Sequence, residues 1–246
     1  MPATPAWPPK SLPRLFVRTP LLEGACVDLD ASQANYLGNV LRMGEGAELL
    51  VFDGSSGEWL ARVTEASKKR MILSVERRTR EAESVPDVWL AFAPVKRAQT
   101  DWLVEKATEL GAARLIPVMT QRTVAERVKL ERMESIAIEA AEQCGRTVLP
   151  EIAEPLSLTR LLAERDPARK LYFADEGGGD RVADTFEVGP TMILTGPEGG
   201  FTDQERASVR AAANAVPISL GPRILRAETA ALAALATWMS VAGDWR

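Results

Sequence analysis

An unbroken apolar run at residues 88–93 limits the fold of this chain more than any other feature. The run reads Val-Trp-Leu-Ala-Phe-Ala and is typical of a strand that is covered on both faces. A helical pattern follows at Arg97–Leu110, with Gly111 as its stop signal. Further strands are expected at 115–118, 171–174, 192–194 and 216–220, and further helices at 130–144, 202–213 and 228–241. This alternation predicts an α/β domain with a mostly parallel sheet.

The residues before this run follow a different pattern. A turn signal, Asp53-Gly54, precedes the alternating segment Glu58–Val63, as in a β-hairpin. A short helix is expected at Ser32–Leu41, with Ser32 as its N-cap. Strands are expected at 15–17, 26–29, 48–52, 58–63 and 71–75. We therefore expect a small barrel-like β module at residues 1–82 and an α/β domain at 83–246, with a linker in the polar segment 79–87.

The amino-acid composition excludes several kinds of site. The chain of 246 residues contains no histidine, which removes Ser-His-Asp and Cys-His nucleophilic schemes and imidazole metal ligands. Cys26 and Cys144 are the only cysteines, so neither a disulfide framework nor a zinc cluster is expected. Any catalysis must therefore depend on carboxylates, cationic side chains, hydroxyl groups or substrate alignment.

Charge and hydropathy suggest a cytoplasmic protein without a general affinity for polyanions. The net charge is −4, which argues against a nucleic-acid footprint over the whole surface. No apolar run approaches the roughly 20 residues of a membrane span, and the Pro-rich N-terminus lacks the apolar core of a signal peptide. Two basic clusters, Lys68-Lys69-Arg70 and Arg77-Arg78, could bind phosphate or could simply form a solvated strand edge.

Two Gly/Pro turns lie close to the C-terminus, one at residues 194–201 and the other at 220–230. Each follows an expected strand and precedes an expected helix. Ligands bind beyond the carboxyl ends of the strands in parallel sheets, so the two turns predict one small-molecule pocket. Neither turn contains a P-loop or a G-x-G-x-x-G motif.

Each turn also has a purely structural interpretation. In the first turn, Thr202 and Glu205 form a capping box that starts a helix, but this does not explain the segment Gly196–Gly200. In the second turn, Arg226 stands at a helix start, where a cation is electrostatically unfavourable. It could therefore serve a ligand, or it could pair with Glu198 or Glu228.

Five segments together carry a specific resemblance over nearly the whole chain. The turns read TGPEGGF and LGPRILRAETAA. Matching segments occur at Asn39–Arg42 with Gly44 and Gly46, at Glu105–Gly111 and at Ala141–Arg146. This set resembles the SPOUT methyltransferases, and specifically the ribosomal RNA small subunit methyltransferase E family. One departure is Tyr36, where that family often has histidine.

The resemblance implies a PUA-like β-barrel followed by a SPOUT α/β domain with a deep trefoil knot. It implies transfer of a methyl group from S-adenosylmethionine to N3 of a uridine in 16S ribosomal RNA, by a homodimer without a metal. Because the chain is acidic, an assembling small ribosomal subunit is the expected substrate rather than naked RNA.

The resemblance implies which residues bind the cofactor, and the chemistry of the reaction suggests catalytic and RNA-contacting residues. The cofactor would be bound by Leu194, Thr195, Gly196, Glu198, Gly200, Leu220, Gly221, Ile224, Leu225 and Thr229. Arg226 would stabilise the uracil anion, and Glu228 would orient Arg226 or accept the proton. RNA would contact Arg14, Arg18, Arg42, Lys68, Lys69 and Arg70, with Arg122 and Arg146 as further candidates for phosphate contacts or ordinary surface residues.

Three other functions stay open at this point. A related SPOUT enzyme could methylate a ribose 2′-oxygen of transfer RNA or ribosomal RNA. A non-catalytic RNA-binding protein with a decayed cofactor site is a second possibility, although Gly196, Gly200 and Arg226 are intact. An unrelated nucleotide-binding protein is disfavoured because the lysine of a P-loop is missing.

Overall fold

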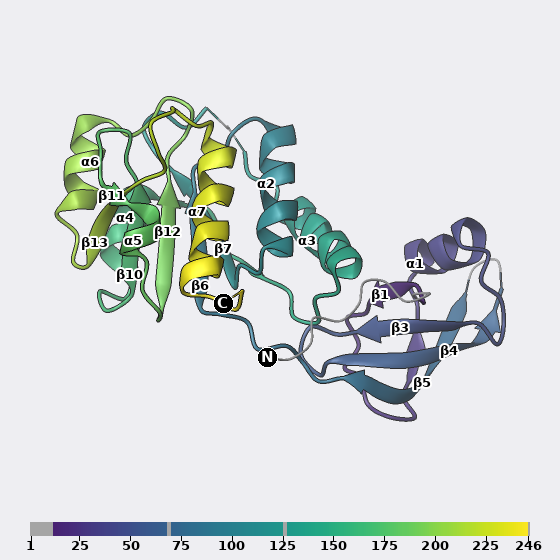
Figure 1. Ribbon diagram of the computed structural model, residues 1–246. Coiled ribbons are helices and arrows are strands. Elements are labelled where there is room, and N and C mark those ends of the chain that lie inside the picture. The colour runs from purple at the N-terminus through teal and green to yellow at the C-terminus, as the bar shows by residue number, and fades with distance from the viewer. Residues whose placement is uncertain (1–11, 68–69, 125–126, 246) are drawn as a thin grey trace. The chain divides into compact units, whose positions relative to one another are not determined.

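The computed structural model describes residues 12–245 except 68–69 and 125–126 (Figure 1). The chain divides into two units. The first unit runs to Glu83 and also includes Gly145–Val148, whereas the second contains Ser84–Cys144 and the chain from Leu149 onward. The segment 145–148, which the sequence analysis placed in the α/β domain, therefore groups with the β-rich unit.

The first unit is built on a five-stranded sheet with the order β1-β3-β4-β5-β2. Its strands are β1 (Arg14–Phe16), β2 (Cys26–Asp28), β3 (Glu48–Phe52), β4 (Glu58–Ala66) and β5 (Met71–Arg80). β1 runs parallel to β3, and the other pairs are antiparallel. The predicted turn after β3 is confirmed, since the Asp53 carboxylate accepts hydrogen bonds from the backbone N–H groups of Ser55 and Ser56. Lys68 and Lys69 lie outside the described residues.

The predicted helix of the first unit differs in its cap and its shape. α1 (Ala31–Asn35) is capped by Asp30, whose Oδ1 accepts a hydrogen bond from the Gln33 backbone N–H at 2.8 Å. Ser32, the predicted cap, lies inside the helix. The chain then widens into a π-helical turn, η1 (Tyr36–Val40).

The second unit contains a parallel sheet, which confirms the predicted α/β class. The strand order is β11-β13-β10-β12-β6-β7-β8, and β9 also pairs with β7. The strands are β6 (Val88–Phe92), β7 (Arg114–Met119), β8 (Glu151–Ile152), β9 (Leu156–Ser157), β10 (Lys170–Ala174), β11 (Asp180–Arg181), β12 (Thr191–Thr195) and β13 (Ala215–Ser219). Every pair in this unit is parallel.

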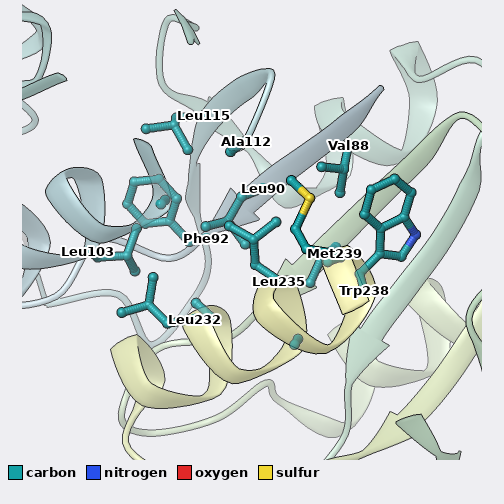
Figure 2. Packing of buried hydrophobic residues seen from close by; sticks show 14 of the residues in the cluster. Val88, Leu90, Phe92, Leu103, Ala112, Leu115, Leu232, Leu235, Trp238 and Met239 are labelled. Carbon is teal, nitrogen blue, oxygen red and sulfur yellow. The ribbon is translucent and has the colours of Figure 1, made fainter. Parts of the chain in front are cut away.

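Helices contribute to two separate apolar clusters on this sheet. They are α2 (Arg97–Glu109), α3 (Leu130–Cys144), α4 (Leu158–Glu164), α5 (Val182–Thr185), α6 (Asp203–Arg210) and α7 (Ala227–Val241). Figure 2 shows one cluster, in which Leu90 and Phe92 of β6 lie near Leu235 of α7. The other cluster joins Ala91 of β6 to residues of α4 and α6.

Successive strand residues alternate between these clusters. Leu90 and Phe92 belong to the first and Ala91 to the second, and β12 repeats the pattern with Ile193 in one cluster and Leu194 in the other. This alternation explains why the strands have no polar face. Among the described residues, no helix is long and apolar enough to cross a membrane. The knot implied by the resemblance stays a prediction.

Candidate active site

A cavity of about 410 Å³ lies in the second unit, where β10, β12 and β13 end. Its walls come from the segments that follow these three strands and from the start of α7. Parallel strands bring their carboxyl ends to the same edge of a sheet, and this edge is the usual ligand site. The two Gly/Pro turns, far apart in sequence, therefore do meet in one cavity.

Most of the predicted cofactor residues line this cavity. These are Thr195, Gly196, Glu198, Gly200, Leu220, Gly221, Ile224 and Leu225. Leu194 and Thr229 do not belong to the lining. Leu194 is fully buried in the apolar cluster on the α6 side of the sheet, because successive residues of a strand point to opposite faces. Thr229 is exposed on the first turn of α7.

Two glycines of the first turn closely approach other side chains. A Cβ atom at Gly200, whose φ is +66°, would lie 2.5 Å from Oε1 of Glu176. A Cβ atom at Gly196 would lie 3.2 Å from the ring of Phe201. Arg122 supports the same turn, since its Nη1 donates a hydrogen bond to the Gly199 carbonyl oxygen at 2.7 Å. Arg122 thus has a structural contact where the sequence analysis considered a phosphate contact.

The helix after this turn begins as the sequence predicts. Thr202 caps α6 by accepting a hydrogen bond from the Glu205 backbone N–H, and Glu205 accepts one from the Thr202 backbone N–H. The second oxygen of Glu205 accepts a hydrogen bond from the Gln121 backbone N–H at 2.7 Å. The buried Glu205 therefore fixes both the start of α6 and the segment that contains Arg122.

A third wall of the cavity, which the sequence motifs did not indicate, is formed by the segment after β10. Asp175, Glu176 and Gly178 line the cavity there. The buried Asp175 pairs with Arg206 at 3.1 Å and with Arg210 at 2.6 Å. Glu176 is exposed and pairs with Arg206 at 3.1 Å. The signal was a charged, glycine-rich run, Asp-Glu-Gly-Gly-Gly at 175–179, directly after an expected strand.

Three charged residues of the lining remain unpaired. Within the described parts of the chain, Glu198, Arg223 and Arg226 have no hydrogen-bond or ion-pair partner, and all three are exposed. Arg226 is the N-cap residue of α7 and has extended backbone angles. The pairing of Arg226 with Glu198 or Glu228, which the sequence left open, is therefore not present.

Glu228 occupies a different place from the predicted one. It is 7% exposed, lies in the first turn of α7 and does not line the cavity. Arg226, the N-cap residue with extended backbone angles, lines the cavity, whereas Glu228 inside the helix does not. The two side chains therefore differ in their access to the cavity, and their catalytic roles stay a prediction.

Arg14, predicted to contact RNA, belongs to a buried polar network of the first unit. Its Nε donates to Glu58 Oε2 at 2.7 Å, and its Nη2 donates to the Arg146 carbonyl oxygen at 2.7 Å. Arg80 donates to the same Glu58 oxygen and to the carbonyl oxygen of Gly145. Burial favours a raised pKa for Glu58, but the hydrogen bonds from Arg80 and Arg14 outweigh it and lower that pKa below its ordinary value.

Arg146 is likewise a structural residue. Its side chain is 6% exposed, and its Nε donates to the Val148 carbonyl oxygen at 3.0 Å. Glu83 accepts hydrogen bonds from the backbone N–H groups of Thr147 and Val148. This network explains why residues 145–148 group with the first unit, and it replaces the expected phosphate contact or surface position of Arg146.

The remaining predicted RNA contacts that the structure describes are exposed. Arg70 pairs with Asp28 at 3.1 Å and with Glu65 at 3.8 Å on the surface of the sheet. The guanidinium of Arg18 lies 6.0 Å from the ring centre of Phe16. Arg42 follows η1 in a left-handed backbone conformation, with φ at +57°.

Two family models match this chain. The one described as an RNA methyltransferase domain matches residues 81–239, and the one described as an RNA methyltransferase PUA domain matches residues 29–76. The first spans the whole parallel sheet and the cavity. The second covers α1, η1, β3, β4 and the first part of β5 in the first unit.

Relatives with the same name align over most of the chain. The ribosomal RNA small subunit methyltransferase E of Synechocystis is 34% identical, over 91% of this chain and 76% of that protein. The Rickettsia conorii protein of that name is 29% identical, over 91% of this chain and 93% of that protein. A crystal structure is known of the Neisseria gonorrhoeae protein of that name, bound to S-adenosylmethionine. Its sequence is 28% identical, and the match covers 96% of this chain and 100% of that chain with a TM-score of 0.88. The chain therefore belongs to the ribosomal RNA small subunit methyltransferase E family.

Proposed function

We propose that this protein transfers a methyl group from S-adenosylmethionine to N3 of a uridine in 16S ribosomal RNA. The observation that carries the proposal is the cavity at the strand ends, where Glu198, Arg223 and Arg226 are exposed and face no partner within the described chain. Charged groups at a concave site without internal partners are typical of a site that meets its counterpart in a ligand. The names of the relatives support ribosomal RNA as the substrate class.

The cavity suits the proposed cofactor. Its volume of about 410 Å³ falls within the roughly 300–1,000 Å³ of small-molecule sites. Ile218, Leu220 and Leu225 provide apolar lining, and Gly221, whose Cβ position has no neighbour within 4 Å, leaves the backbone accessible to a ligand. When bound, S-adenosylmethionine supplies an electrophilic methyl group on a cationic sulfonium.

Arg226 would stabilise the uracil anion. The neutral imide of uracil is a poor nucleophile, so negative charge must develop on the ring as the N3 proton leaves. Arg226 lines the cavity and has no carboxylate partner among the described residues, so its guanidinium is available for O2 or O4 of the base. An electrostatic partner of this kind stabilises a transition state most when it is held in place before the reaction.

Glu198 is the carboxylate best placed to accept the N3 proton. Asp175 and Glu176 also line the cavity, but both are ion-paired with arginine. Glu228, the acceptor considered from the sequence, is buried in α7 and outside the lining. We therefore assign proton acceptance to Glu198 and leave Glu228 as a buried residue of the helix start.

The substrate nucleotide would have to be unpaired or flipped out, because N3 lies on the Watson–Crick edge of uracil. An acidic chain binds naked RNA weakly, so we propose that the protein acts in the cytoplasm on an assembling small subunit. By resemblance to its family, we propose that it acts as a homodimer.

Mass spectrometry of 16S ribosomal RNA from cells that lack this protein tests the substrate. We expect one 3-methyluridine to disappear and to return when the purified protein and S-adenosylmethionine are added to small subunits from those cells. Retention of every 3-methyluridine would refute the base and the position. Loss of a ribose methylation instead would indicate the related 2′-O-methylating activity.

A further inference from the structure

The β-turn that carries Glu198 is closed by one backbone hydrogen bond. The Gly200 N–H donates to the Pro197 carbonyl oxygen at 2.9 Å, so Glu198 and Gly199 are the two central residues of the turn. The Glu198 side chain has no partner within the described chain that could hold it in one direction. Its placement in the cavity therefore depends on how the turn itself is oriented.

Arg122 holds this turn from outside. Its Nη1 donates a hydrogen bond to the Gly199 carbonyl oxygen at 2.7 Å and lies 3.5 Å from the Phe201 carbonyl oxygen. A Cβ atom at Gly199 would lie 3.4 Å from both Cβ and Cδ of Arg122, so the aliphatic stem of the arginine also lies against the turn. A hydrogen bond from a charged donor is roughly twice as strong as one from a neutral donor. No carboxylate among the described residues competes for this guanidinium.

The segment that carries Arg122 is held by hydrogen bonds of its own. The Thr120 backbone N–H donates to Thr123 Oγ1 at 2.9 Å, and the Thr123 N–H donates to the Thr120 carbonyl oxygen at 3.2 Å. The Gln121 N–H donates at 2.7 Å to Oε1 of the buried Glu205, which caps α6. These bonds connect the end of β7 to the start of α6, and the arginine extends the connection to the turn.

Arg122 reaches the site only through the turn. It is not part of the lining of the cavity, whereas Glu198 and Gly200 are. A change at Arg122 therefore removes no group that a ligand in the cavity would touch, but it frees the turn to shift. A misplacement of a reacting group by about 1 Å can cost about 10²-fold in rate.

We propose that Arg122 is a positioning residue for methyl transfer and that it acts by orienting Glu198. The inference rests on the proposed function, in which the Glu198 carboxylate takes the N3 proton of the uridine. As that proton leaves, the N3 electron pair forms the bond to the methyl group, and the bond between this methyl group and sulfur breaks to leave a neutral thioether. Arg122 forms no bond to the reactants, and it keeps the acceptor oxygen where the proton leaves.

The first test separates turnover from cofactor binding. The full chain is assayed in single turnovers with S-adenosylmethionine and small subunits from cells that lack the protein. Arg122→Ala should lower the rate of methyl transfer by about 10- to 100-fold, whereas its affinity for S-adenosylmethionine, measured by calorimetry, should stay near that of the wild type. Arg122→Lys should recover most of the rate, because it keeps an aliphatic stem and a cationic donor for the Gly199 carbonyl oxygen.

A double-mutant cycle tests whether Arg122 acts through Glu198. Glu198→Gln removes the proton acceptor and keeps the size of the side chain, so its rate should already be low. Adding Arg122→Ala to it should lower the rate by less than about twofold more, because no acceptor is left to misplace. A contact of Arg122 with an RNA phosphate, or a general weakening of the fold, would instead multiply the two losses.

Arg160→Ala is the matched control. It removes another exposed arginine of the second unit, one that pairs with Glu164 on the surface of α4, and it should leave rate and cofactor affinity unchanged. Melting curves of all variants check that they fold. If Arg122→Ala does not fold, Arg122→Gln, which keeps a shorter stem and a neutral donor, takes its place in the cycle.

Three results would overturn the inference. They are a wild-type rate for Arg122→Ala, a loss of rate that an equal loss of cofactor affinity explains, and losses that multiply in the double variant. The proposed function fails by different results. A wild type that does not methylate the small subunits would refute it, and a wild-type rate for Glu198→Gln would refute its proton acceptor and this inference together. An active wild type, a slow Glu198→Gln and losses that multiply would overturn the role of Arg122 alone.

Discussion

The protein contains two clusters of arginines and carboxylates that differ in one respect. In the first unit, Arg14, Arg80 and Glu58 form a network in which each charge has a partner, and the carboxylate of Glu58 is only 6% exposed. In the cavity of the second unit, Arg226 and Glu198 are exposed and have no partner among the described residues. The same residue types thus serve structure in one cluster and are available to a ligand in the other.

This difference follows from the cost of removing charge from water. A buried ion must be paired and hydrogen-bonded, or it destabilises the fold. The network around Glu58 satisfies this requirement, because the buried carboxylate is paired and hydrogen-bonded to both Arg14 and Arg80. The charges of the cavity keep their hydration until a ligand arrives, and this leaves their interaction energy available for binding.

The largest expected effect comes from breaking the buried network. Glu58→Ala leaves Arg14 and Arg80 without their shared carboxylate, so the first unit should lose about 3–5 kcal/mol of unfolding free energy. Chemical denaturation measures the loss of unfolding free energy, and hydrogen exchange of the β4 amides shows that the loss occurs in the first unit. The affinity for S-adenosylmethionine should stay near that of the wild type, because the cavity lies within the second unit.

Glu48→Ala is the matched control for this variant. Glu48 pairs with Arg62, but both side chains are 39% exposed, and exposed pairs contribute about 1 kcal/mol or less. Similar losses of unfolding free energy for Glu58→Ala and Glu48→Ala would show that burial does not make the ion pairs of Glu58 more important than that of Glu48.

Removing an unpaired charge of the cavity should instead lower activity and leave stability nearly unchanged. Arg226→Ala should lower the rate of methyl transfer by about 10²–10³-fold and change the unfolding free energy by about 0.5 kcal/mol or less. Single-turnover incorporation of labelled methyl groups and a denaturation curve measure the two quantities. A large loss of stability with normal turnover would reverse the roles assigned to the two clusters.

Sequence patterns predicted the bounds of helices and strands well where local signals mark the element and its end. α3 occupies Leu130–Cys144 and β3 occupies Glu48–Phe52, as expected. The apolar pattern of α3 and its glycine stop are local signals, as is the turn after β3. β5 reaches Arg80, beyond its expected end at Val75, because strand pairing with β4 continues into polar residues.

The site was predictable only in part, because the partners of a charged side chain depend on how the chain folds. The motifs identified the two turns that meet at the cavity, but nothing local to Arg14 indicated its bond to a carbonyl group 132 residues away. The wall at Asp175–Gly178 likewise depends on Arg206 and Arg210 of α6. The motif identified the residue types, and the tertiary contacts determined which charges remain available.

A substitution at Gly200, with a smaller expected effect, tests the contact between two walls of the cavity. Gly200→Ala places a Cβ atom at a left-handed backbone position, with φ at +66°, and against the Glu176 carboxylate, so it should weaken binding of S-adenosylmethionine by about tenfold, which corresponds to about 1.4 kcal/mol. Calorimetry measures the affinity. Glu176→Ala in the same chain removes the overlap and should restore part of the loss, whereas additive losses would show that the two walls act independently.

The smallest expected effect is the pH dependence of the first unit. Hydrogen bonds from Arg80 and Arg14 outweigh burial and hold the pKa of Glu58 below its ordinary value in the folded protein. A lowered pKa in the folded state contributes stability that is fully present above the ordinary pKa of a glutamate and is lost as the pH falls through the lowered value. The wild type should therefore lose more unfolding free energy on acidification than Glu58→Gln, which cannot ionise there. Parallel curves of unfolding free energy against pH for the two proteins would mean that the charge of the Glu58 carboxylate does not stabilise the network. The difference between this network and the cavity would then depend on hydrogen bonding alone.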